Sequence, residues 1–263
     1  MKRVIAALAA LVLAVVLVSV QPWGGAEARI LVFADRTLQP PLEELARMYV
    51  EEKALDGVEV NVTFIYGSSG YVLSQLEIQG RGDVYVADDQ YFALIGVDRG
   101  LLYPRSLETI GYLRLVLVVQ EGNPKGITSI QDVLERGDVT IAIGNPEHVS
   151  AGVLAKRVLE KAGLWDSVEE LVGTGRVVMV KSASEAASYV MLGLVDAAIT
   201  FNIYVNLNPD KLDIVDDPLL ADFKAPVVVA LPRGASEAGV DFYRYIIGNA
   251  EVFYKYGVEP GKG

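Results

Sequence analysis

Short apolar runs alternate with segments of helical periodicity from residue 29 onward. Residues 30–33 form a continuous apolar run, and residues 58–64 alternate apolar with polar side chains, so both segments are predicted strands. Between them, apolar residues recur at helical spacing over 42–50, after the Pro40-Pro41 pair that is expected at a helix start. This alternation is typical of an α/β fold with largely parallel strands.

Two longer apolar runs, residues 112–119 and 226–231, enclose a second α/β set. We therefore expect two Rossmann-like lobes joined by two crossing strands. Lobe 1 would comprise residues 29–111 plus 232–263, and lobe 2 residues 112–231. One further helical pattern over residues 241–256 is predicted to return to lobe 1.

The N-terminus, residues 1–28, has the layout of a secretory signal peptide. Lys2 and Arg3 precede an apolar stretch over residues 4–20, and Ala26-Glu27-Ala28 offers a small-x-small cleavage site. The stretch also approaches the roughly 20 residues that span a bilayer, so an uncleaved membrane anchor stays open. In either case we expect an exported domain, in the periplasm or on the extracellular face of the cytoplasmic membrane.

Composition argues against several function classes. The formal net charge is −11 and no block rich in lysine or arginine occurs, which argues against nucleic acid as a partner. The absence of cysteine excludes disulfides and zinc–sulfur sites, and the single histidine, His148, excludes a histidine-rich metal cluster. We expect no cofactor and no direct ligands for a metal cation.

Small and hydroxyl-bearing residues recur where a predicted strand gives way to a predicted helix. They are Thr37, the Ser68-Ser69 pair between two glycines, Ser150 with Ala151, and Ser182 with Ala183. Helix N-termini offer unpaired N–H groups and a positive dipole end, and in α/β sheets they lie at the ligand-binding edge. Helix starts from both lobes could therefore hold an anion, although each could also be an ordinary cap worth ~1 kcal/mol.

An enzyme remains an alternative at the same serines. Ser69 as the nucleophile of an exported hydrolase of anionic esters would need His148 or an acid as its base. The GSSG stretch is not the G-x-S-x-G elbow of hydrolases, which disfavours an enzyme. We interpret Asp88 and Asp89 as solvated loop carboxylates.

Four stretches resemble one known family: FADRTLQPPLEELA, GSSGYVLSQLEIQGRGDVYVADD, IGNPEHVSAGVLAKRVLEKAGLWD and DAAITF. They are similar to the periplasmic molybdate-binding proteins of ABC transporters, which are type II solute-binding proteins. The resemblance implies a non-enzymatic, two-lobed, hinge-closing protein that captures molybdate or tungstate. It also implies an ABC-transporter permease and its ATPase as partners, and a monomer. Sulfate or phosphate as the anion, and a membrane-anchored sensor, stay open.

The resemblance also implies site residues. Thr37 and Ser69 would contribute hydroxyls, Ala151 and Ala183 backbone N–H groups, and Ser68 and Ser150 lie beside them. Phe201 falls where some family members have a tyrosine, so one hydroxyl is lost there. Asn202 or Tyr204 could replace it.

Asp35 and Arg36 stand where the family usually has small residues. We interpret them as a mutual ion pair or as solvent-facing groups, because surface pairs carry little energy. Alternatively, a carboxylate at the site would repel a dianion and accept a hydrogen bond from a protonated anion such as hydrogen phosphate. The preferred oxyanion therefore stays open.

Overall fold

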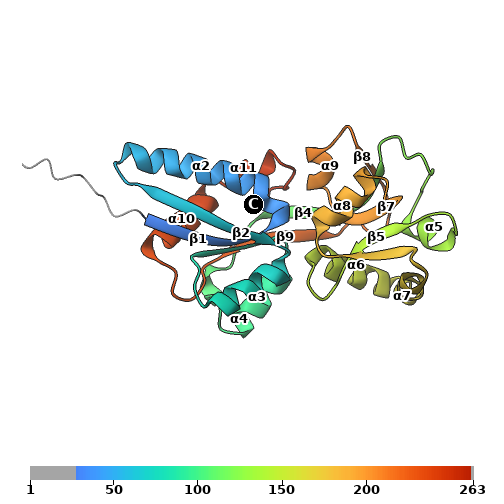
Figure 1. Cartoon of the computed structure of the whole chain (residues 1–263), viewed down its shortest axis with the longest axis horizontal. Helices are drawn as coiled ribbons and strands as arrows, with labels where there is room; N and C mark the ends of the chain where they lie inside the picture. The colour runs from blue at the N-terminus through green and yellow to red at the C-terminus, as the bar shows by residue number, and fades with distance from the viewer. Residues whose placement is uncertain (1–27, 262–263) are drawn as a thin grey trace, which may run out of the picture.

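The computed structural model describes residues 28–261, and the predicted signal peptide or anchor lies outside this range except for Ala28. Neighbouring strands of the sheet are hydrogen-bonded in the spatial order β2-β1-β3-β9-β4-β7-β5-β6, and β8 also pairs with β4 (Figure 1). The strands are β1 (Ala28–Asp35), β2 (Val60–Gly67), β3 (Val84–Ala87), β4 (Glu108–Gln120), β5 (Ile141–Gly144), β6 (Val177–Val180), β7 (Ala197–Phe201), β8 (Leu212–Val215) and β9 (Lys224–Ala230).

Helices follow most strands and cover both faces of the sheet (Figure 1). They are η1 (Arg36–Leu38), α2 (Gln39–Leu55), α3 (Ser69–Gln79), α4 (Gln90–Asp98), η2 (Pro104–Ser106), α5 (Ile130–Glu135), α6 (Ser150–Lys161), α7 (Trp165–Thr174), α8 (Ala183–Met191), α9 (Ile203–Leu207), α10 (Glu237–Gly248) and α11 (Glu251–Tyr254). Between residues 28 and 261, no helix has the length and apolarity needed to span a bilayer.

The two-lobed α/β fold class predicted from the sequence is confirmed. In lobe 1, β1 pairs in parallel with β2 and β3; in lobe 2, β5 pairs in parallel with β6 and β7. The strand β4 belongs to both lobes, because its first half pairs with β9 and its second half with β7 and β8. Figure 1 shows β4 and β9 running between the lobes. The lobe boundaries given above remain a prediction.

The C-terminal helical segment packs on lobe 1, as expected, against β1 and α2. The rings of Phe242 and Tyr245 on α10 lie 4.9 and 5.0 Å from the ring of Tyr49 on α2. The prediction of one helix over 241–256 is wrong, because the helix breaks at Asn249 and Ala250 into α10 and α11. This packing completes lobe 1 with residues from the chain's far end.

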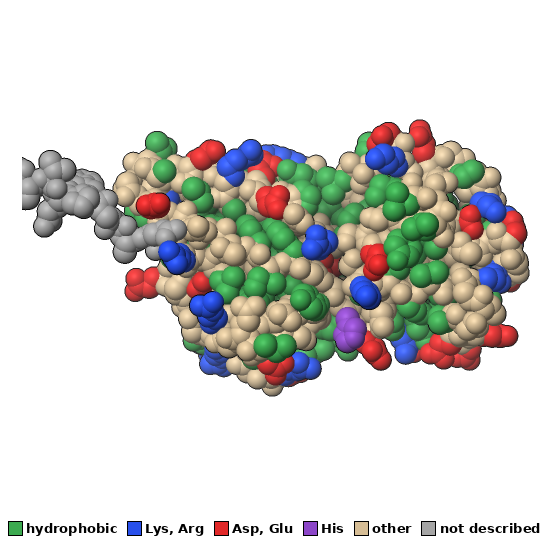
Figure 2. Space-filling view, viewed as in Figure 1, with side chains coloured by type: hydrophobic (Ala, Val, Ile, Leu, Met, Phe, Trp, Pro, Cys, Tyr) green, Lys and Arg blue, Asp and Glu red, His purple; other side chains and the backbone are tan. Residues whose placement is uncertain are grey.

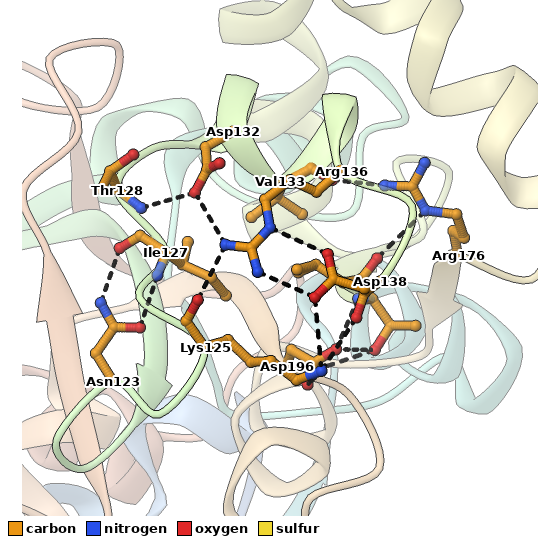
Figure 3. A network of polar contacts seen from close by, with 12 residues as sticks. Asn123, Lys125, Ile127, Thr128, Asp132, Val133, Arg136, Asp138, Arg176 and Asp196 are labelled. Carbon is orange, nitrogen blue, oxygen red and sulfur yellow. Dashed lines mark hydrogen bonds and ion pairs between the residues drawn. The ribbon is translucent and has the colours of Figure 1, made fainter.

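A polar network ties together the outer end of lobe 2, away from the other lobe (Figures 1 and 3). Arg136 lies 3.1 Å from the carboxylate of Asp138 and 3.6 Å from that of Asp132. Arg176 donates to the carbonyl oxygen of Val133 at 2.7 Å and also to that of Leu134. The hydrogen bonds from Arg176 satisfy carbonyl groups near the C-terminus of α5, because such groups have few partners within this short helix.

Candidate functional site

Helix starts from both lobes meet where the lobes touch. Thr37 lies in η1 after β1, and Ser69 begins α3 after β2. The Tyr204 hydroxyl of lobe 2 donates to Thr37 Oγ1 of lobe 1 at 3.0 Å. In the other direction, the Gly70 N–H of lobe 1 donates to the carbonyl oxygen of His148 in lobe 2 at 3.2 Å. Two hydrogen bonds therefore link the lobes directly at this point.

Ser69 is the centre of the buried group. Its side chain is 0% exposed, and its Oγ lies 2.8 Å from Asp35 Oδ2 and 2.8 Å from Asp88 Oδ1. The Tyr85 hydroxyl donates to the Ser69 carbonyl oxygen at 2.9 Å, which fixes the start of α3. Ser68 occupies the N-cap position of α3 with extended backbone, but its side chain makes no capping hydrogen bond. The Ser69 side chain therefore points into the buried group.

The interpretation of Asp35 and Asp88 as solvent-facing groups is wrong. They are only 4% and 1% exposed. Asp35 caps η1 by accepting from the Thr37 N–H at 2.9 Å, and Asp88 accepts from the Thr37 hydroxyl at 3.3 Å. Asp89 is 3% exposed and caps α4 by accepting from the Tyr91 N–H at 2.7 Å. We call Asp35 and Asp88 the acid pair.

Burial raises the pKa of Asp35, against the lowering effect of its hydrogen bonds from Thr37 and Ser69. Burial, followed by the neighbouring charge of Asp35, holds the pKa of Asp88 well above its ordinary value. The geometry agrees, because the Ser69 hydroxyl has one hydrogen and two carboxylate neighbours. Ser69 is the donor in both contacts, so its single hydrogen is shared between two carboxyl groups, and the raised pKa values favour the neutral form of the acid pair.

Ser150 brings a further hydroxyl from lobe 2. Its side chain is 0% exposed, and it lies close enough to lower the pKa of Asp88. Its Oγ nevertheless finds no acceptor with hydrogen-bond geometry among the described residues. A buried hydroxyl of this kind costs free energy unless a partner arrives. Ser150 therefore faces Asp88 from lobe 2 without a well-formed hydrogen bond.

Tyr204 is the residue that reaches the site near the end of β7. Phe201 is fully buried in the hydrophobic core. The Asn202 side chain accepts from the Arg114 N–H and donates to the Gly257 carbonyl oxygen, both at 2.8 Å, so it is occupied elsewhere. Of the two residues proposed to replace the missing tyrosine hydroxyl, only Tyr204 contacts Thr37.

The remaining predicted site residues lie at two lobe 2 helix starts. Ala151 and Ala183 are 1% and 3% exposed, in the first turns of α6 and α8, where backbone N–H groups lack intrahelical partners. Ser182 caps α8, because its Oγ accepts from the Glu185 N–H at 3.1 Å. The helix α8 also contacts η1 of lobe 1, so its start faces Thr37's segment.

An open pocket of about 560 Å³ adjoins this buried group. We call it the outer pocket; its lining includes Ser68, Tyr71, His148, Arg36 and Lys181. The last two are cationic, so the approach to the buried group is positively charged on a chain that is acidic overall. Figure 2 shows the furrow between the lobes with the histidine at its edge.

The geometry does not provide the histidine base of the hydrolase alternative. The His148 imidazole is 64% exposed and lies 3.7 Å from the Glu147 carboxylate. Ser69 instead contacts two carboxyl groups with raised pKa values. The serine–histidine contact that a nucleophile and its base require is not formed.

Residues 30–259 match the family described as bacterial extracellular solute-binding proteins. The chain belongs to this family. It is 31% identical to a Bacillus subtilis protein named "Putative ABC transporter substrate-binding lipoprotein", over 87% of this chain and 85% of that one. It is 27% identical to the molybdate-binding protein of Escherichia coli, over 88% and 89% of the two chains.

A solved structure supports the fold. The sulfate-binding protein of Mycobacterium tuberculosis superposes with a TM-score of 0.75 at 19% identity, covering 89% of this chain and 87% of that one. The resemblance read from the four sequence stretches is thus confirmed at the level of the family. The chain is therefore a member of the bacterial extracellular solute-binding proteins.

Proposed function

We propose that this solute-binding protein captures a tetrahedral oxyanion between its lobes for import. The observation that carries the proposal is the meeting of buried hydroxyls from both lobes at the helix starts. Thr37 and Ser69 belong to lobe 1, and Ser150 and Tyr204 to lobe 2. Neutral hydroxyls and backbone N–H groups at helix N-termini suit an anion that must later be released.

Molybdate and tungstate are the first candidates, because one relative is a molybdate-binding protein. The structural neighbour named for sulfate supports testing a second fully ionised oxyanion. Phosphate completes the panel as an anion that keeps a proton near neutral pH. The chain's own side chains bear on this choice and are considered in the next subsection.

The mechanism follows from the two lobes. An anion approaches through the outer pocket, past Arg36 and Lys181, and reaches the hydroxyls of Thr37 and Ser69. Closure brings Ser150 and Tyr204 against it and excludes water, which strengthens each dipolar interaction in the lower dielectric. The closed form docks on the permease, and the ATPase drives release and transport. The N-terminal segment would export the chain and could tether it to the membrane.

A thermal-shift titration with molybdate, tungstate, sulfate and phosphate tests the proposal. An anion at ~100 times its dissociation constant should stabilise the protein by ~2.7 kcal/mol. Ser69→Ala should weaken that anion by about ten- to a hundredfold, because a hydrogen bond to a charged group is lost. Ser106→Ala is the matched control, a buried lobe 1 serine that bonds the Tyr103 carbonyl oxygen. No shift with any of the four anions would refute the proposed function.

A further inference from the structure

The acid pair makes this site unlike a pocket that only donates hydrogen bonds. Asp35 ends β1 and Asp88 directly follows the neighbouring parallel strand β3, so both carboxyl groups lie at the carboxyl ends of these strands. Both contact Ser69 Oγ at 2.8 Å. A proton-free oxyanion bound here would face two buried acids.

The charged and titratable groups around the acid pair do not neutralise it. The charge of Asp89, at the start of α4, adds to the repulsion on Asp88. From β3 and α9 come Tyr85 and Tyr204, which burial keeps in their neutral form by raising the pKa of each phenol. The guanidinium of Arg157 on α6 acts on Asp89 rather than on the pair. Arg36 and Lys181 line the outer pocket.

The lobe 1 hydroxyl hydrogens of this group already have acceptors. The Ser69 hydrogen is shared between Asp35 and Asp88, and the Thr37 hydrogen goes to Asp88. An anion that only accepts would take these hydrogens and leave buried carboxylate oxygens without donors. An anion with its own O–H would take the same hydrogens and return one to Asp88. The second exchange leaves fewer buried carboxyl oxygens without a donor.

Ser150 gives independent evidence that a ligand belongs beside Asp88. Its hydroxyl is fully buried, comes from the opposite lobe and lowers the pKa of Asp88, yet it lacks good hydrogen-bond geometry to any described residue. A ligand oxygen next to Asp88 would accept the Ser150 hydrogen, while an O–H on the same ligand donates to Asp88. The two side chains therefore define one acceptor and one donor position on the ligand.

We propose that the site selects tetrahedral oxyanions that carry a proton, the phosphate and arsenate class, over fully ionised ones such as sulfate and molybdate. The selection rests on the proposed function, since it names the anion class of that same site. Asp88 is the specificity-determining residue, because it contacts both Ser69 and Thr37. Sites built to bond a ligand O–H reject analogues that lack it by large factors.

Calorimetric titration of the purified chain at pH 7 with phosphate, arsenate, sulfate and molybdate tests the inference. We expect phosphate and arsenate to bind at least about a hundredfold more tightly than sulfate and molybdate. Asp88→Asn places an amide donor where the carboxylate stood, so it should weaken phosphate and strengthen sulfate by at least tenfold each. Asp35→Asn serves as the second variant, with the same direction expected, should Asp88→Asn fail to fold.

Asp217→Asn is the matched control. Asp217 is a buried lobe 2 aspartate whose carboxylate accepts from the Ile130 and Leu219 N–H groups, away from the site. Its replacement should leave the phosphate-to-sulfate ratio unchanged. Equal or tighter binding of sulfate or molybdate by the wild type, or an unchanged ratio in the folded Asn variants, would overturn the inference while the proposed function stands. No binding of any of the four anions would overturn both.

Discussion

The Tyr204 hydroxyl gives a direct test of the contact between the lobes. It donates to Thr37 Oγ1 at 3.0 Å, and the two residues belong to different lobes. Tyr204→Phe keeps the ring, which is buried at 7% exposure, and removes only the hydroxyl. The substitution therefore acts on the closed arrangement and leaves the packing within each lobe intact.

The magnitude follows from the value of one hydrogen bond. A neutral hydrogen bond contributes about 0.5–1.5 kcal/mol, which corresponds to a two- to twelvefold change in an equilibrium constant. Whether the hydroxyl bonds Thr37 or the anion in the closed form, the loss falls on the bound state. The dissociation constant of the tightest anion should therefore rise about two- to twelvefold, as measured by isothermal titration calorimetry.

Tyr49→Phe is the matched control for this prediction. The Tyr49 hydroxyl donates to Asp241 at 2.9 Å, and both residues lie in lobe 1. Its loss should lower the melting temperature and leave the dissociation constant unchanged. An unchanged dissociation constant for Tyr204→Phe, or an equal rise for both variants, would refute the argument that the tyrosine hydroxyl bridges the lobes.

Three further predictions concern the lobe contact, the core of lobe 2 and the acid pair. A Cβ on Gly70 would lie 2.7 Å from the Phe92 ring and 2.9 Å from the backbone carbonyl oxygen of His148 in the other lobe, so Gly70→Ala should raise the dissociation constant about five- to a hundredfold, by calorimetry. A Cβ on Gly152 would lie 2.1 Å from the Gly144 carbonyl oxygen, so Gly152→Ala should lower the free energy of unfolding by about 1–3 kcal/mol, by denaturant titration. Burial raises the pKa of Asp88, so the native protein binds this proton more tightly than the unfolded chain does, and stability falls as pH rises from about 4. Asp88→Asn without added anion should therefore be more stable than the wild type at pH 8 and match it near pH 4, by thermal melts.

Gly173→Ala is the common control for the two glycine variants. A Cβ there meets nothing within 4 Å, and the residue lies in α7, where alanine favours the helix. The lobe-contact argument fails if Gly70→Ala binds as tightly as this control. Equal unfolding curves for Gly152→Ala and the control would contradict the packing argument. Parallel pH profiles for Asp88→Asn and the wild type would show that Asp88 is not held protonated by burial.

Hydrophobic periodicity predicted the main strands correctly. The apolar runs at 30–33 and 112–119 lie inside β1 and β4. Buried parallel strands give strong continuous apolar runs, so such segments are readable without a structure. The helices α4, α5, α7 and α9 and the strand β8 were not anticipated.

The helix starts were also readable, because capping residues and glycines mark them locally. The role of the acid pair could not be predicted from such local signals. Asp35 and Asp88 meet only because β1 and β3, which are separated in the sequence by other elements, are direct neighbours in the sheet. Sequence alone does not give that strand order. Tyr204 reaches Thr37 only when two lobes close on one another. Local sequence patterns therefore do not predict contacts that depend on strand order and on the approach of the two lobes.

Co-crystals grown separately with arsenate and tungstate give the most direct test of the anion site. Both central atoms scatter anomalously, so a difference map locates the anion without assumptions about its shape. The account predicts a peak between the lobes, with anion oxygens within hydrogen-bond distance of Ser69 Oγ, Thr37 Oγ1 and Ser150 Oγ, and higher occupancy for arsenate. A peak elsewhere, or none for either anion at saturating concentration, would contradict it.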